Sequence, residues 1–112
     1  MAAENLDGSA PGMRCRTFDT PGGTIVYWVS EAVRPEHPWL VFLPGLTADR
    51  RLFELQLEHF CGRASCLVWD PPAHGASRPF RLDFTMDDMA IWLHGILEAA
   101  GVARPVLVGQ SM

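Results

Sequence analysis

The sequence predicts an α/β fold in which an antiparallel hairpin precedes a parallel β-α-β-α-β segment. Residues 14–19 and 24–29 flank a Thr-Pro-Gly-Gly turn, and the second of these segments is rich in β-branched and aromatic residues. This pattern is typical of a hairpin. From residue 39 onward, short continuous apolar runs alternate with segments whose apolar residues recur at helical spacing. Such apolar runs suit strands that are covered on both faces, as in a parallel sheet.

Three later strands are expected, at residues 39–43, at residues 66–69 and from residue 105 toward the Gly-x-Ser motif, each followed or preceded by turn residues. Pro105 can begin the last strand, because its missing N–H is tolerated at that position. A helix is expected over residues 49–60. Its apolar residues are spaced for one buried face: Leu52, Phe53, Leu57 and Phe60.

A second helix is expected to begin at Thr85 and to end at Gly101. Asp88 stands three residues after Thr85, which is the spacing of a capping box. The apolar residues of this segment predict one buried face: Met86, Met89, Ala90, Leu93, Ile96, Leu97 and Ala100.

The length and composition fit one soluble globular domain at most. The 112 residues are 48% hydrophobic and carry a net charge of −4, which argues against a nucleic-acid partner because no basic surface is available to neutralise phosphates. No apolar run approaches the roughly 18 residues that a membrane span requires, and the N-terminus does not resemble a signal peptide. Three cysteines, an odd number, predict reduced thiols and a cytoplasmic location. Residues 1–13 are expected to form a flexible tail.

The most informative motif is the Gly-x-Ser of Gly109, Gln110 and Ser111, which follows an apolar strand. A serine on a sharp turn between a strand and a helix is the nucleophile elbow of a serine hydrolase. Glycine is expected beside such a serine, because a Cβ there would clash with neighbouring backbone. The motif therefore predicts Ser111 as a nucleophile.

Four ordered segments together resemble the N-terminal part of the α/β-hydrolase fold superfamily, in particular its esterase- and lactonase-like serine hydrolases. Pro44-Gly45 resembles the family's His-Gly turn, and the segment from Asp70 to Ser77 resembles its Asp-x-x-Gly-x-Gly-x-Ser loop. The capped helix from Thr85 and the elbow complete the series. Pro44 departs from the family pattern, which has histidine there to shape the turn, so the loop is expected to be held differently.

The resemblance implies a site made largely of backbone groups. Ser111 would be the nucleophile, and the backbone N–H groups of Leu46 and Met112 would form the oxyanion hole. Gly45 and Gly109 would support the two turns. The resemblance implies hydrolysis of an ester, a lactone or a related acyl bond in a small molecule, with no cofactor and no metal ion.

All four histidines and all thirteen acidic residues precede Ser111. The family's chain order places the catalytic acid and histidine after the serine. His74 is therefore expected to shape a loop rather than to act as the base, and Asp70 is expected to anchor that loop. We also expect residues 14–112 to be an incomplete hydrolase domain, truncated before the helix after the elbow, and the chain alone to be inactive.

Other functions fit the same residues. An acyltransferase, a perhydrolase or a C–C hydrolase would keep the fold and change the chemistry. A non-catalytic binding protein with a hydrolase-like fold is a further alternative. A nucleotide-binding α/β domain is disfavoured, because neither Gly-x-Gly-x-x-Gly nor a Walker A motif occurs.

Overall fold

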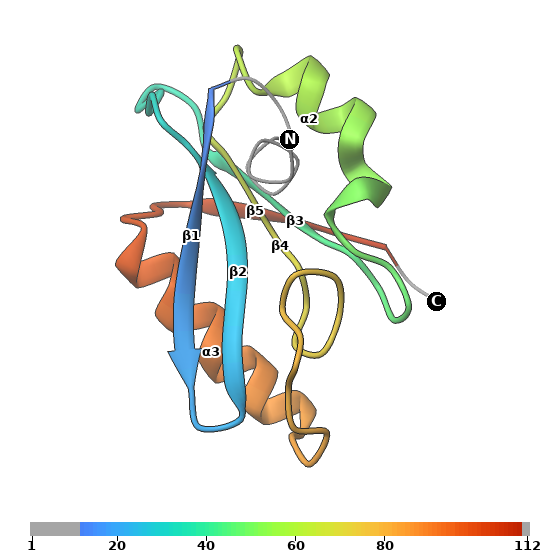
Figure 1. Cartoon of the computed structure of the whole chain (residues 1–112). Coiled ribbons are helices and arrows are strands. Elements are labelled where there is room, and N and C mark those ends of the chain that lie inside the picture. The colour runs from blue at the N-terminus through green and yellow to red at the C-terminus, as the bar shows by residue number, and fades with distance from the viewer. Residues whose placement is uncertain (1–11, 111–112) are drawn as a thin grey trace.

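The computed structural model describes residues 12–110, which form a five-stranded mixed sheet with helices packed on it (Figure 1). The strands are β1 (Met13–Thr20), β2 (Gly23–Ser30), β3 (Trp39–Leu43), β4 (Cys66–Trp69) and β5 (Pro105–Gly109). A 3-10 helix η1 (Arg50–Phe53) continues into α2 (Glu54–Phe60), and α3 (Met86–Ala99) lies between β4 and β5. This is the predicted α/β class, with the hairpin first and the β-α-β alternation after it.

The strand order is β1-β2-β4-β3-β5. β1 pairs antiparallel with β2, and β2 pairs antiparallel with β4. β3 lies between β4 and β5 and is parallel to both. The carboxyl ends of β3, β4 and β5 therefore meet at one edge of the sheet, where ligands bind in open α/β sheets.

The two faces of the sheet carry separate apolar clusters, because successive strand residues point to opposite sides. One face packs Trp28, Phe42 and Val68 against Phe53 and Leu57 of the η1–α2 segment. The other face packs the alternating strand residues against Ile96 of α3; they include Ile25, Tyr27, Val29, Trp39, Val41, Leu67 and Trp69. Trp39 and Trp69 are thus core residues, as their place in apolar strands indicates.

The helix ends follow from local sequence signals. Thr85 caps α3 by accepting a hydrogen bond from the Asp88 N–H, and the Asp88 carboxylate accepts one from the Thr85 N–H. The predicted capping box is confirmed. Gly101 follows the helix with a φ of +71°, a conformation that glycine adopts at little cost.

Several finer predictions were wrong. β1 begins at Met13, whose side chain is buried in the core, so the boundary predicted for the tail falls too late. The segment expected as one helix over residues 49–60 begins as a 3-10 turn. Four residues assigned to buried helix faces are exposed: Leu52, Phe60, Met86 and Ala90. Phe60 is the last residue of α2 and Met86 the first of α3, and helical spacing alone cannot show how far along a helix the sheet reaches.

Within residues 12–110, none of the helices has the length and apolar character needed to cross a membrane.

Candidate active site

The candidate site lies where the loops after β3 and β4 meet the end of β5. These loops cover residues 44–49 and 70–79, and Gln110 follows β5. The Gln110 N–H donates a hydrogen bond to the Leu43 carbonyl at 3.2 Å, which continues the pairing of the two strands beyond their ends. The sheet therefore brings the loop after β3 directly beside the residue that precedes Ser111.

Gly45 is the point of closest approach between these segments. A Cβ added to Gly45 would lie 2.4 Å from the Gln110 carbonyl oxygen, a separation that no side chain tolerates. Glycine at this position is therefore a steric requirement. Gly109 differs, because a Cβ added there would meet nothing within 4 Å among the described residues. Gly109 ends an edge strand and is exposed. The crowding expected there stays a prediction, because Ser111 and Met112 lie outside the described residues.

The loop after β3 forms a tight turn. The Ala48 N–H donates to the Gly45 carbonyl at 3.0 Å, which makes Leu46 and Thr47 the central residues. Thr47 has a φ of +68°, which is rare for a residue with a β-branched side chain. In the described part of the chain no acceptor is found for the Leu46 N–H. This N–H is therefore available as a donor at the mouth of the site.

Ser111 and Met112 lie outside the described residues, so their predicted roles as nucleophile and second oxyanion donor stay predictions. What the structure provides is their attachment point. Gln110 lines a cavity of about 430 Å³ together with residues of both loops and the start of α3: Gly45, Leu46, Pro71, Pro72, Met86 and Met89. His74 and Phe84 complete the lining, with Pro44. The cavity is mainly apolar, and His74 is its one titratable side chain within residues 12–110.

Asp70 organises the loop after β4. Its side chain is fully buried and accepts hydrogen bonds from the Arg50 N–H, the Arg50 guanidinium and the Ala76 N–H, at 2.8, 2.8 and 2.7 Å. The Arg50 guanidinium also lies 4.3 Å from the centre of the Trp28 ring, within reach of a cation–π contact. The expectation that Asp70 anchors its turn is confirmed.

The partnership with Arg50 was missed, because Arg50 lies 20 residues earlier in a different element. Gly75 completes the arrangement. It has a φ of +49°, and a Cβ there would lie 2.3 Å from an Asp70 carboxylate oxygen. The Ser77 hydroxyl donates to the Asp70 carbonyl at 2.7 Å and accepts from the Val26 N–H at 2.9 Å, so the loop is tied to β2 as well.

His74 is the histidine nearest the candidate site. Its Nε2 accepts a hydrogen bond from the Thr47 N–H at 3.0 Å, and its Nδ1 lies 3.0 Å from the Pro72 carbonyl oxygen. His37, His59 and His94 are exposed and line none of this cavity. His94 lies one helical turn from Glu98, at 3.5 Å. These three histidines are surface residues, as predicted.

The charged and sulfur-bearing groups around the loops have ordinary roles. Arg51 donates to the Asp49 carboxylate, and this bond lowers the pKa of Asp49. None of the three cysteines forms a disulfide among residues 12–110, and burial raises the pKa of Cys66 to about 12. No group of three His, Cys, Asp or Glu side chains suited to a metal ion occurs among residues 12–110.

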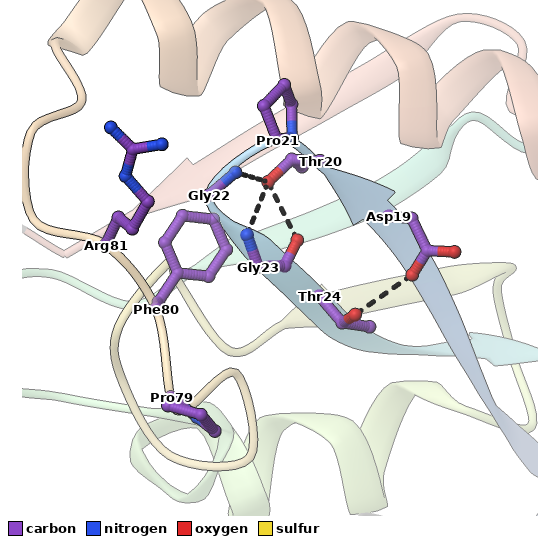
Figure 2. Close-up of a pocket in the computed structure, with 9 residues that line it drawn as sticks. All are labelled: Asp19, Thr20, Pro21, Gly22, Gly23, Thr24, Pro79, Phe80 and Arg81. Carbon is purple, nitrogen blue, oxygen red and sulfur yellow. Dashed lines mark hydrogen bonds between the residues drawn. The ribbon is translucent and has the colours of Figure 1, made fainter.

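A second, open depression of about 600 Å³ lies at the hairpin turn (Figure 2). The Thr20 hydroxyl donates to the Gly23 carbonyl at 2.8 Å and accepts from the N–H groups of Gly22 and Gly23, while Thr24 donates to Asp19 at 2.9 Å. The Phe80 ring lies against the turn, and a Cβ on Gly23 would meet it at 2.7 Å. The Arg81 N–H also donates to the Gly22 carbonyl at 2.9 Å, so the segment that follows the loop after β4 is held on the hairpin.

Comparison with known proteins decides the family. The alpha/beta hydrolase fold family matches residues 38–112, which is more than half of the chain. The chain belongs to the α/β-hydrolase fold family. The loop after β3 and Gln110, which meet at the candidate site, both lie within the matched residues.

Solved structures show the same fold at low sequence identity. A bacterial membrane phospholipase A aligns with a TM-score of 0.74 and 22% identity, over 98% of this chain and 35% of its own. The Cif epoxide hydrolase from Acinetobacter nosocomialis aligns with a TM-score of 0.76 and 19% identity, over 98% of this chain and 35% of its own. A haloalkane dehalogenase loop variant from Bradyrhizobium elkanii aligns with a TM-score of 0.71 and 20% identity, over 88% of this chain and 32% of its own. The chain thus spans about a third of these α/β-hydrolase structures, and no curated protein matches it.

Proposed function

We propose that this chain is the N-terminal part of a serine hydrolase that cleaves an ester, a lactone or a related acyl bond, with Ser111 as its nucleophile. The observation that carries the proposal is the contact between Gly45 and Gln110. A Cβ on Gly45 would lie 2.4 Å from the Gln110 carbonyl, so the turn that carries Leu46 abuts the residue before Ser111. A donor from one loop and a serine from the next are the two parts that acyl transfer requires at one place.

The proposed reaction proceeds through an acyl-enzyme. The Ser111 oxygen bonds to the acyl carbon and gives up its proton to a general base, while the carbonyl π electrons move onto the acyl oxygen. The N–H groups of Leu46 and Met112 stabilise the resulting oxyanion. Collapse of this intermediate expels the alcohol, which takes the proton from the base. Water then attacks the acyl-enzyme in the same manner and releases the acid.

The general base comes, in this proposal, from the part of the hydrolase beyond this chain. His74 lines the cavity, but its Nε2 already accepts a hydrogen bond from Thr47. The family's order of serine, acid and histidine points the same way. The term whole hydrolase is used below for a protein that contains this chain together with the remaining part of such a domain.

The lining of the cavity supports an uncharged substrate. Leu46, Pro71, Pro72, Met86 and Met89 offer apolar surface, and neither carboxylate nor guanidinium groups from the described residues line it. We therefore propose a small-molecule acyl compound with an apolar portion as the substrate, and neither cofactor nor nucleic acid as a partner. The odd number of cysteines, none of them in a disulfide among residues 12–110, supports a cytoplasmic location as part of the same proposal.

The test is the Ser111→Ala variant of the whole hydrolase with p-nitrophenyl acetate as substrate. Loss of a nucleophile lowers kcat by at least about 10³-fold, the scale seen when a triad member is removed. A fluorophosphonate probe should label the parent and leave the variant unlabelled. The matched control is Ser77→Ala, which removes a buried structural serine and should leave Ser111 reactive in whatever fraction remains folded. Near-normal turnover by Ser111→Ala would exclude the assignment.

A further inference from the structure

The apolar cavity of the candidate site adjoins a second hollow, and one side chain lines both. The second hollow has a volume of about 270 Å³ and is formed by the hairpin turn, the segment that follows the loop after β4, and the first turns of α3. Its lining includes Phe80, Arg81 and Trp92. Within residues 12–110, Phe84 is the one residue that lines both this hollow and the cavity of about 430 Å³. The Phe84 ring therefore stands between the two spaces.

Phe84 is held in this position by two other rings. Its ring centre lies 5.6 Å from that of Phe80, with an angle of 83° between the ring planes, and 5.8 Å from that of Trp92. The Phe80 and Trp92 rings are themselves 5.6 Å apart, so each of the three rings packs against the other two. Aromatic pairs at such separations attract each other beyond the burial of their surface. The Phe84 ring is thus a fixed part of the cavity wall.

The chain on either side of Phe84 is fixed as well. Phe80 lies against the hairpin, where a Cβ on Gly23 would meet its ring at 2.7 Å. Thr85, which follows Phe84, is the N-cap of α3 and closes the capping box. Phe84 and Met89 therefore occupy the two positions of a hydrophobic staple, one directly before the N-cap and the other in the first turns of the helix. Both residues line the apolar cavity.

The same cavity connects this wall with the proposed reaction centre. Its lining also includes Leu46, the proposed oxyanion donor, and Gln110, which precedes Ser111. An apolar chain attached to the reacting ester group would therefore lie along the cavity and approach the Phe84 ring. Each methylene group buried on such a surface raises kcat/KM about fourfold. The gain ends where the chain meets a side chain that does not move.

We propose that the substrate is a carboxylic ester with an unbranched apolar chain, and that Phe84 sets the length of that chain by closing the cavity toward the second hollow. This inference deepens the proposed function and rests on it. Replacing the ring by a methyl group would join the two spaces. The second hollow can then receive the end of a chain, because its charged groups already have partners: Arg81 pairs with Asp83 at 2.5 Å, and Asp88 accepts from the Thr85 N–H at 2.9 Å.

The test compares Phe84→Ala with the parent in the whole hydrolase, on two series of straight-chain esters. The p-nitrophenyl esters from acetate to dodecanoate lengthen the acyl side, and the alkyl acetates from methyl to decyl lengthen the alcohol side. In the parent, kcat/KM should rise to a maximum within one series and then fall. In Phe84→Ala that maximum should move to a chain longer by about two methylenes or more, so that kcat/KM for this longer ester, relative to the ester that the parent prefers, increases at least about tenfold.

Three companion variants make each outcome decisive. Phe84→Leu keeps an apolar side chain in the staple and should move the maximum in the same direction by less, so it serves where Phe84→Ala does not fold. Phe60→Ala removes a ring from α2 that lines neither space, and it should leave the preferred chain length unchanged. Ser111→Ala reports on the proposed function itself. A partial loss of folded protein lowers kcat/KM for all esters alike, so the preferred chain length separates the proposed role from a purely structural one.

A shift of the maximum in the acyl series would support the inference and place the chain on the acyl side, and a shift in the alkyl series would place it on the alcohol side. A loss of kcat/KM by the same factor for every ester would overturn the inference, because the ring would then only stabilise the fold. A parent without a maximum in either series would also overturn it. Full activity of Ser111→Ala would refute the proposed function, and with it the inference, in a measurement separate from the chain-length series.

Discussion

Removal of the Asp70 carboxylate should destabilise the fold more than the loss of any exposed ion pair. Asp70 is fully buried, and its partner Arg50 is only 14% exposed. Asp70→Ala leaves the guanidinium and two backbone N–H groups without their acceptor, at Arg50 and Ala76. Breaking a buried pair in this way costs about 3–5 kcal/mol. The Trp28 ring still faces the guanidinium, so we expect the lower part of that range.

The assay is urea unfolding of the whole hydrolase, followed by tryptophan fluorescence and interpreted by linear extrapolation. Asp83→Ala is the matched control, because Asp83 pairs with Arg81 where both side chains are 66% exposed, and such pairs contribute less than about 1 kcal/mol. Asp70→Asn keeps the shape and loses the charge, so it should cost at least about 1 kcal/mol and serves where Asp70→Ala is insoluble. Equal stabilities of Asp70→Ala and Asp83→Ala would refute the argument.

Three further predictions concern glycines and a thiol. Gly75→Ala should lower the free energy of unfolding by at least about 2 kcal/mol, because its Cβ would lie 2.3 Å from a buried carboxylate oxygen at a φ of +49°; Gly62→Ala, where an added Cβ meets nothing within 4 Å, is the control that should unfold at nearly the parent urea concentration. Gly45→Ala should reduce ester turnover at least about tenfold while fluorescence still reports a folded protein, since its Cβ would push the turn away from Gln110; unchanged kcat would contradict the proposed site. Burial raises the pKa of Cys66 to about 12 from 9.0, so the folded state holds this proton more tightly, and stability is full below pH 9.0 and declines as the pH rises toward 12; rapid reaction of Cys66 with a thiol reagent at pH 8 in the native protein would contradict this burial.

The order and type of the elements could be predicted from the sequence because their signals are local. β3 and β4 were bounded correctly at residues 39–43 and 66–69, since an apolar run flanked by turn residues marks both ends of a buried strand. The start of α3 was equally clear, because the capping box depends on residues only three positions apart. Glycines were expected to support the turns at both Gly45 and Gly109. The structure shows a steric requirement for glycine at Gly45, and the role of Gly109 stays a prediction.

Only the tertiary structure decided which distant groups meet. The Asp70–Arg50 pair and the His74–Thr47 bond join residues 20 and 27 positions apart, and neither pair has a spacing that a local pattern could reveal. Both depend on β4 lying beside β3, which brings the loops after those strands to the same edge of the sheet. The sequence by itself predicted the α/β-hydrolase fold, because strand, helix and turn preferences act between near neighbours. The arrangement of strands in the sheet determines which loops form hydrogen bonds with each other. Such bonds depend on distances in space, which the order of residues along the chain does not contain.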